Sequence, residues 1–223
     1  MRKVGVIGLG HVGSTVAYTL VTKGIADELV LIDTNEAKCT AEFYDLLDSL
    51  GRLDTYTKLS MNDYKALQDA DVVITAFGDI KALADGGNRF LEYSFNCQQA
   101  KQVGTALKEA GFHGVLINIS NPCDVITGLL QHYTGLIRQQ VFGTGTFLDT
   151  ARMQRAVSMS LDQNPHNIAG YVLGEHGESQ FAAWSTITVQ GEPITEIAKD
   201  QHLELSELDK AARGGGWLVF NGK

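Results

Sequence analysis

Three polar residues in the second half of the chain are of the types that acid–base chemistry on an organic acid needs. Asp149 and Arg152 lie three residues apart in a segment with helical patterning, so they share one face of the expected helix. His176 stands in a loop between Gly174 and Gly177, where functional residues are common. Oxidation of a hydroxy acid requires a base, a carboxylate that orients it and an arginine that binds an anion. A surface ion pair and a loop histidine without a catalytic role are the alternatives.

A glycine-rich turn in the first half predicts a dinucleotide site. Gly8, Gly10 and Gly13 follow the first apolar run and open a helical segment. This spacing allows a tight turn, close approach of a pyrophosphate to backbone N–H groups, and close packing of helix on sheet. Asp33 ends the second apolar run, where a carboxylate can accept hydrogen bonds from an adenosine ribose and repel a 2′-phosphate. His11, inside the motif, is interpreted as a spacer and not as a catalyst.

Short apolar runs alternate with helical patterns through the first two thirds of the chain. The runs predict strands at 4–7, 29–32, 71–75, 114–119 and 141–143, and the segments between them predict helices that end near residues 24, 50, 111 and 133. Strands that are apolar on both faces are typical of a parallel sheet covered by helices. We therefore expect an α/β fold, with a Rossmann-type, doubly wound parallel sheet in a first domain over residues 1–143.

The character of the sequence changes near residue 144. A patterned helix is expected over residues 146–161, followed by extended segments, and together they predict a second, α+β domain over residues 144–223. A last helix begins near Ser206 and its pattern still continues at Lys223. Three consecutive glycines, 214–216, weaken that helix by about 1 kcal/mol each relative to alanine. We therefore expect the second domain to be incomplete.

Composition and charge limit the possible partners. The 223 residues carry 18 Lys and Arg against 26 Asp and Glu, a formal net charge of −8, without a basic stripe, so we expect no nucleic-acid partner. No apolar run approaches the ~18 residues of a membrane span, so we expect no membrane partner. Cys39, Cys97 and Cys123 are widely spaced, which is typical of a reducing compartment and not of a metal site. We expect a cytoplasmic protein without a metal.

Five motifs stand in order along the chain: the turn 8–13 with Asp33, the strand and turn 71–78, the segment 119–124 (ISNPCD), the segment 143–152 (GTGTFLDTAR) and the loop 174–177 (GEHG). In this order they resemble the L-lactate/malate dehydrogenase family, especially the branch that includes L-2-hydroxyisocaproate dehydrogenases. The resemblance implies an NAD-dependent L-2-hydroxy acid dehydrogenase, with small 2-oxo and 2-hydroxy acids as partners. It also implies a homo-oligomer, by the family's pattern a tetramer, for a full-length chain.

The resemblance also assigns roles to residues. His176 matches the family's proton-relay histidine and Asp149 its partner carboxylate, while Arg152 matches the arginine that binds the substrate carboxylate. Arg89 matches the arginine that polarises the carbonyl from a mobile loop, and Asn121 the residue between nicotinamide and substrate. The expected cofactor-binding residues are Gly8, Gly10, His11, Val12, Gly13, Asp33, Lys38, Tyr64, Gly78 and Asn121. For Lys38 and Tyr64, a solvated lysine and a half-buried tyrosine are open alternatives.

The loop 79–88 departs from the family's pattern. It lacks the glutamine typical of lactate dehydrogenases and the second arginine of malate dehydrogenases, and its Ile80, Ala82 and Leu83 offer apolar contacts. We expect a medium-sized apolar 2-oxo acid, such as 2-oxoisocaproate, or pyruvate as substrate. Malate-type specificity through Lys81 and a nucleotide-binding fragment without turnover are the alternatives. The family's C-terminal portion is not matched, so a chain ending at Lys223 is expected to bind NADH weakly and turn over poorly.

Overall fold

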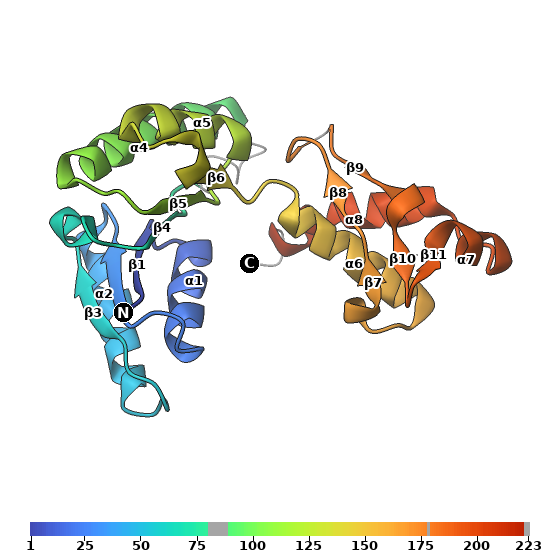
Figure 1. Cartoon of the computed structure of the whole chain (residues 1–223), viewed down its shortest axis with the longest axis horizontal. Coiled ribbons are helices and arrows are strands. Elements are labelled where there is room, and N and C mark those ends of the chain that lie inside the picture. Colours follow the sequence, from blue (N-terminus) through green and yellow to red (C-terminus); the bar gives the residue numbers. More distant parts are fainter. Residues whose placement is uncertain (80–88, 178, 221–223) are drawn as a thin grey trace. The chain divides into compact units, whose positions relative to one another are not determined.

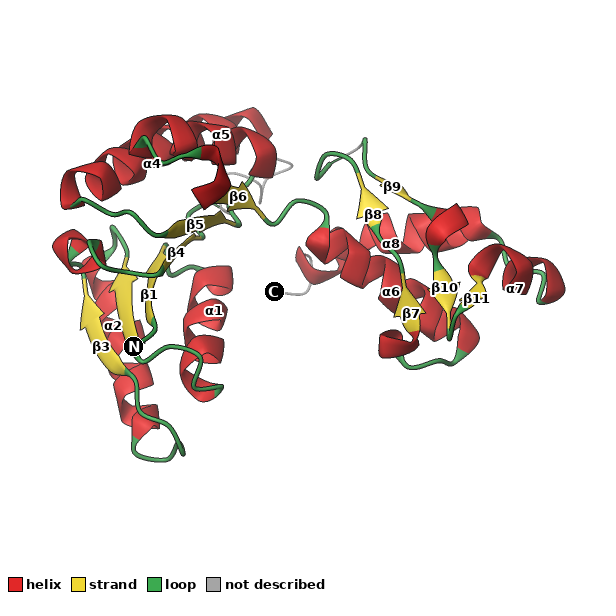
Figure 2. Cartoon of the chain, viewed as in Figure 1, coloured by secondary structure: helices red, strands yellow, loops and turns green. Residues whose placement is uncertain are grey.

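The structure is a computed structural model that describes residues 1–79, 89–177 and 179–220, without the side chains of residues 89–91, 217 and 220. The chain divides into two compact units, Met1–Gly143 and Thr144–Lys223 (Figures 1 and 2). Each unit has its own sheets and its own buried core, and each is described by itself. None of the described helices is long and apolar enough to cross a membrane.

The first unit is built on a six-stranded parallel sheet in the order β3-β2-β1-β4-β5-β6. The strands are β1 (Lys3–Ile7), β2 (Glu28–Ile32), β3 (Lys58–Met61), β4 (Val72–Thr75), β5 (Val115–Asn118) and β6 (Val141–Gly143). The chain runs outward from β1 to β3 and then resumes with β4 on the other side of β1. Ligands of such sheets bind at this reversal point, beyond the carboxyl ends of the strands. The predicted doubly wound parallel sheet is confirmed.

Helices cover both faces of this sheet. One face carries α1 (His11–Thr22) and α2 (Glu36–Leu50), and the other carries α4 (Arg89–Ala110) and α5 (Cys123–Thr134) (Figure 1). Along β2, Leu29 and Leu31 belong to the buried cluster under α1 and α2, whereas Val30 and Ile32 belong to the cluster under α4 and α5. This alternation explains why β2 is apolar at every position from Leu29 to Ile32.

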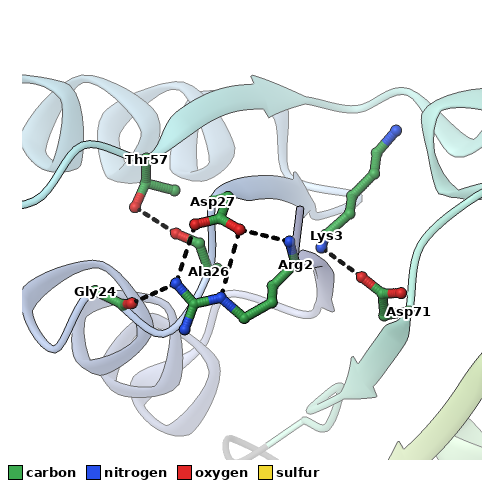
Figure 3. Close-up of polar contacts among 7 residues, drawn as sticks. All are labelled: Arg2, Lys3, Gly24, Ala26, Asp27, Thr57 and Asp71. Carbon is green, nitrogen blue, oxygen red and sulfur yellow. Dashed lines mark hydrogen bonds and ion pairs between the residues drawn. The ribbon is translucent and has the colours of Figure 1, made fainter.

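Polar contacts gather at the amino ends of the strands (Figure 3). This end of the sheet is opposite the glycine turn, which follows the carboxyl end of β1. The guanidinium of Arg2 donates to Oδ1 of Asp27 at 3.0 Å and to the carbonyl of Gly24 at 3.0 Å, and its backbone N–H donates to Asp27 at 2.6 Å. The backbone N–H of Lys3 donates to Asp71 at 2.8 Å. Hydrogen bonds from Arg2 lower the pKa of Asp27 to about 2.

The second unit packs two small sheets against helices. Its helices are α6 (Phe147–Leu161), α7 (Ile194–Asp200) and α8 (Leu205–Phe220), and its strands form the sheets β11-β10-β7 and β8-β9. The strands are β7 (Ile168–Ala169), β8 (Val172–Leu173), β9 (Phe181–Ala182), β10 (Thr188–Val189) and β11 (Glu192–Pro193). Met153 and Val157 of α6 and Leu208 and Ala212 of α8 lie in one buried cluster, so α8 keeps its helical form through its three glycines by packing against α6.

Candidate active site

A cleft of about 300 Å³ lies at the carboxyl ends of the strands in the first unit. Its lining includes five of the residues that the sequence assigns to cofactor binding: Gly8, Gly10, Asp33, Tyr64 and Gly78. These residues are far apart in the sequence, and the parallel sheet brings them to one edge because each follows or lies close to a strand end. The cleft therefore occupies the position at which this class of sheet binds ligands.

The glycine turn at this cleft has the shape of an anion cradle. Gly8 has a positive φ of +91°, and a side chain at Gly13 would overlap the carbonyl oxygen of Gly8. Nothing lies within 4 Å of the place where a side chain of Gly10 would be. The helix α1 begins at the next residue, without an acidic residue in its first turn, so its first N–H groups can bind an anion. The turn thus fits a pyrophosphate.

Asp33 is fixed in the cleft by two backbone donors. The N–H of Leu9 donates to Oδ2 at 2.6 Å, and the N–H of Asn35 donates to Oδ1 at 2.8 Å. The carboxylate has further lone pairs that can accept hydrogen bonds from ribose hydroxyls. Tyr64 lines the same cleft, and burial raises its pKa to about 12, so its phenol stays neutral and can donate a hydrogen bond at physiological pH.

Three other expected cofactor residues, His11, Val12 and Lys38, are not among the residues that line the cleft. His11 and Val12 form the exposed first turn of α1, beside the glycine turn. Lys38 lies in the first turn of α2, where it pairs with Glu42, and it is not among the residues that line the cleft. Lys38 is therefore a partly exposed, ion-paired residue, and its assignment to the cofactor site remains a prediction.

A buried polar network shapes the loop that carries Asn121. Asn118, at the end of β5, accepts a hydrogen bond from Thr75 at 3.0 Å, and its amide nitrogen donates to the carbonyls of Ser120 and Cys123 at 3.1 Å each. The side chain of Asn96 on α4 donates to the carbonyl of Asn121 at 2.6 Å. Asn121 itself is exposed, so the network supports its backbone and leaves its side chain accessible.

Arg89 is the first residue of α4. The loop 80–88 before it, with Ile80, Lys81, Ala82 and Leu83, lies outside the described residues, and so does the side chain of Arg89. The roles assigned to Arg89 and to this loop therefore remain predictions.

In the second unit, Asp149, Arg152 and His176 form one connected group. Oδ2 of Asp149 lies 2.5 Å from Nδ1 of His176, and Oδ1 accepts a hydrogen bond from Nη1 of Arg152 at 3.1 Å. The side chain of Asp149 is 4% exposed, against 20% for Arg152 and 24% for His176. A buried carboxylate thus orients two side chains that solvent and small ligands can reach. The sequence predicts these three residues, and the structure brings them together.

Two threonines that the sequence analysis missed attach the histidine loop to α6. Thr146 donates through Oγ1 to the carbonyl of Val172 at 2.6 Å, and Thr150 accepts through Oγ1 from the N–H of Val172 at 3.0 Å. These threonines are four residues apart and lie on one face of the helix, on either side of Asp149. Because β8 contains Val172, the helix that bears the carboxylate also fixes the start of the loop that bears His176.

Glycines of α8 lie against Arg152. A side chain at Gly215 would lie 3.2 Å and 3.3 Å from Cδ and Cγ of Arg152 and 3.0 Å from Nη2 of Arg155. A side chain at Gly216 would lie 3.4 Å from Nη2 of Arg152. Gly215, one of the glycines that weaken the helix in isolation, therefore leaves room for the side chain of Arg152.

Sequence reasoning also missed Asn96 and Asn118. Both are fully buried, and asparagine is a poor residue for a helix interior or a strand. An asparagine inside an otherwise apolar run, as in β5, is a usable signal for a buried polar network. Their partners could not be predicted, because these hydrogen bonds join separate segments of the fold.

Known proteins resemble this chain over its whole length. The NAD-binding domain of the lactate/malate dehydrogenases matches residues 2–143, and the alpha/beta C-terminal domain of the same family matches residues 146–219. L-lactate dehydrogenase 3 of Bacillus thuringiensis is 37% identical, over 100% of this chain and 71% of its own length.

Solved structures agree with these matches. A minor L-lactate dehydrogenase from Enterococcus mundtii, in its ligands-bound form, has a TM-score of 0.92 and 35% identity over 99% of this chain and 71% of its own. A lactate dehydrogenase from Cryptosporidium parvum, complexed with lactic acid and nicotinamide adenine dinucleotide, has a TM-score of 0.86 and 26% identity over 96% of this chain and 67% of its own. The chain belongs to the lactate/malate dehydrogenase family, whose members are NAD-dependent oxidoreductases acting on the CH–OH group of 2-hydroxy acids.

Proposed function

We propose that the protein is an NAD-dependent L-2-hydroxy acid dehydrogenase that reduces a 2-oxo acid reversibly. The observation that carries this proposal is the buried carboxylate of Asp149, which holds a histidine and an arginine at once. These are the base, the orienting carboxylate and the anion-binding group that the reaction needs. NAD, when bound, supplies the hydride in one direction and accepts it in the other.

His176 is the proposed proton donor and acceptor. Because Nδ1 bonds to Asp149, we assign the exchanged proton to Nε2. The carboxylate fixes the tautomer of the neutral imidazole and stabilises the imidazolium. Reduction requires the protonated ring and oxidation the neutral ring, so the protonation state of His176 determines which direction it can serve.

Arg152 is the proposed binding group for the substrate carboxylate. A guanidinium presents donors in a planar fork, which matches a carboxylate in a bidentate manner, and one of its nitrogens is already held by Asp149. We assign polarisation of the substrate carbonyl to Arg89 and contact with both nicotinamide and substrate to Asn121. The family resemblance supports these two roles.

The cleft of the first unit is the proposed NAD site. The turn at Gly8, Gly10 and Gly13 fits the pyrophosphate, and Asp33 is placed to accept hydrogen bonds from the adenosine ribose. Tyr64 and Gly78 also line this cleft, and the family resemblance supports further cofactor contacts at His11, Val12 and Lys38. Since Asp33 carries a negative charge beside the ribose position, the site favours NADH over NADPH.

The proposed substrate is a medium-sized apolar 2-oxo acid or pyruvate, from the residues of the loop 79–88. The test is a panel of 2-oxo acids with NADH, including pyruvate, 2-oxoisocaproate and oxaloacetate, beside a fluorescence titration of NADH. Turnover of 2-oxoisocaproate or pyruvate supports the proposal. A strong preference for oxaloacetate contradicts the substrate class, and NADH binding without turnover of any 2-oxo acid contradicts the dehydrogenase assignment.

We also infer that the protein works in the cytoplasm as a homo-oligomer. The three thiols are unpaired in the structure, in keeping with a reducing compartment, and the family resemblance supports self-association. Light scattering coupled to size exclusion tests the oligomeric state, and a monomer at micromolar concentration contradicts that part of the proposal.

A further inference from the structure

Gln180 lies directly before β9, and its side-chain amide reaches the carboxylate of Asp149. With its nitrogen toward Asp149, the amide donates to Oδ2 at 2.9 Å and to Oδ1 at 3.3 Å. The opposite orientation would place the amide oxygen against two oxygens that can only accept. We propose that Gln180 is a positioning residue that holds the Asp149 carboxylate and weakens the attraction between this carboxylate and the imidazolium proton of His176. This inference rests on the proposed function of the Asp149–His176 pair.

Three donors share the buried carboxylate of Asp149. His176 binds Oδ2 at 2.5 Å, Arg152 binds Oδ1 at 3.1 Å, and Gln180 bridges both oxygens. Gln180 is the uncharged donor among these three, because an amide neither carries a charge nor titrates. A hydrogen bond to the charged form of a carboxylate stabilises its negative charge. The carboxylate consequently attracts the imidazolium proton less strongly than it would without this third donor.

The fold holds Gln180 from two sides. Its backbone N–H donates to the carbonyl of Gly177 at 3.3 Å, and its carbonyl accepts a hydrogen bond from Arg213 of α8. The guanidinium of Arg213 is oriented in turn by Asp209, which accepts from Nε at 2.7 Å. The next residue, Phe181, pairs with Leu173 between β9 and β8. The amide is therefore placed at Asp149 by backbone contacts, not only by its own side-chain conformation.

The elements that carry the Asp149–His176 pair and pack against it bring other charged groups. The helix α6 contributes Arg152 and Arg155, and α8 contributes Arg213 with Asp209. The histidine loop contributes Glu175, which accepts a hydrogen bond from Ser179 at 2.9 Å. Replacement of the Gln180 side chain leaves all of these charges in place. A change in the titration of His176 then reports the lost amide donor.

The test compares wild type with Gln180→Met, which keeps a similar length and removes the donor, and with Gln180→Leu as a second variant of this kind. NMR follows the ring proton of His176 from pH 5 to 9, identified among the six histidines by its loss in His176→Asn. We expect the midpoint of the His176 titration to rise by about half a pH unit or more, as removal of one hydrogen bond to a charged group predicts. The decline of kcat/KM for pyruvate reduction should move to higher pH by the same amount.

Ser179→Ala is the matched control, because Ser179 precedes Gln180 and bonds to Glu175. We expect the midpoint of the His176 titration in Ser179→Ala to match that of wild type. Folded Gln180 variants with an unchanged midpoint would overturn the proposal, even if their turnover were lower, because they would show a structural role only. The NMR titration needs no turnover, so an inactive wild-type protein would contradict the proposed function and still leave this proposal tested.

Discussion

Asp149 and His176 are 27 positions apart in the sequence, and their side chains meet at 2.5 Å. The carboxylate is 4% exposed and the imidazole 24%, so the acid lies inside the unit and the histidine lies at its surface. A buried carboxylate needs donors at all times, because an uncompensated charge in the interior is costly. The same contact that satisfies Asp149 therefore orients His176.

Replacement of His176 by asparagine should lower kcat for pyruvate reduction by about 10²–10⁴-fold, the usual contribution of a positioned acid–base group. An asparagine can still bond to Asp149 but cannot transfer a proton in this pH range. NADH affinity, measured by fluorescence titration, should stay near the wild-type value because the glycine turn lies in the first unit. A variant with near wild-type kcat would remove His176 from the mechanism.

Replacement of Arg152 by lysine should act mainly on KM for the 2-oxo acid. One of two parallel hydrogen bonds to the substrate carboxylate is lost, and a charge-assisted bond of about 1.5–3 kcal/mol corresponds to a decrease in kcat/KM of roughly 10–100-fold. Steady-state kinetics measure the effect. Arg155→Lys, on the same helix, is the control, since Arg155 contacts a carbonyl of α8 at 3.5 Å. Equal losses in both variants would argue against a specific role for Arg152.

Replacement of Asp33 by asparagine should narrow the preference for NADH over NADPH. The asparagine retains an oxygen that can accept from the N–H of Leu9, which Asp33 accepts at 2.6 Å, and it removes the charge that repels a 2′-phosphate. Two like charges about 4 Å apart near a protein surface repel by roughly 4 kcal/mol. The kcat/KM with NADH divided by the kcat/KM with NADPH should therefore fall by at least about tenfold. An unchanged ratio would show that Asp33 does not face the 2′ position.

The first unit could be predicted from the sequence because parallel strands buried on both faces leave continuous apolar runs. β3 was missed, since this edge strand reads Lys-Leu-Ser-Met and is only partly buried. The seven residues of α7 were missed as well, since Ile194, Ile197 and Ala198 cover little more than one helical turn. Short elements of this kind depend on the core they pack against, and local pattern cannot predict them.

The candidate site, too, could be predicted from the sequence only in part. Residue type, the helical spacing of Asp149 and Arg152 and the loop setting of His176 made these residues candidates, and the family resemblance assigned their roles. Gln180 and Asn96 act through hydrogen bonds to residues on other elements, and those contacts exist only after the unit has folded. Their residue types are common at the surface of any protein, so the sequence carries no signal for the role of Gln180.

Alanine at Gly215 should raise KM for the 2-oxo acid, whereas alanine at the neighbouring Gly214 should not. Either change favours the helix by about 1 kcal/mol, and nothing lies within 4 Å of a side chain at Gly214. Gly214→Ala should therefore raise the thermal midpoint and leave KM unchanged. A side chain at Gly215 comes within 3.2 Å of Arg152, so Gly215→Ala should displace the guanidinium and raise KM for the 2-oxo acid several-fold. Equal KM values in the two variants would show that α8 does not position Arg152.

Replacement of Asp27 by asparagine should destabilise the first unit in a pH-dependent manner. Arg2 lowers the pKa of Asp27 to about 2, from 3.8 for the free side chain, so the carboxylate contributes stability at every pH well above 3.8. That contribution is lost as the pH falls from about 4 towards 2, where Asp27 becomes protonated in the folded state too. Calorimetric melts should show a lower unfolding temperature for Asp27→Asn than for wild type from pH 7 to about pH 5. This difference should shrink below about pH 4. Asp48→Asn, at an exposed position of α2, should match wild type throughout. A difference for Asp27→Asn that stays constant down to pH 3 would mean that the ionised carboxylate is not what holds the amino ends of the strands.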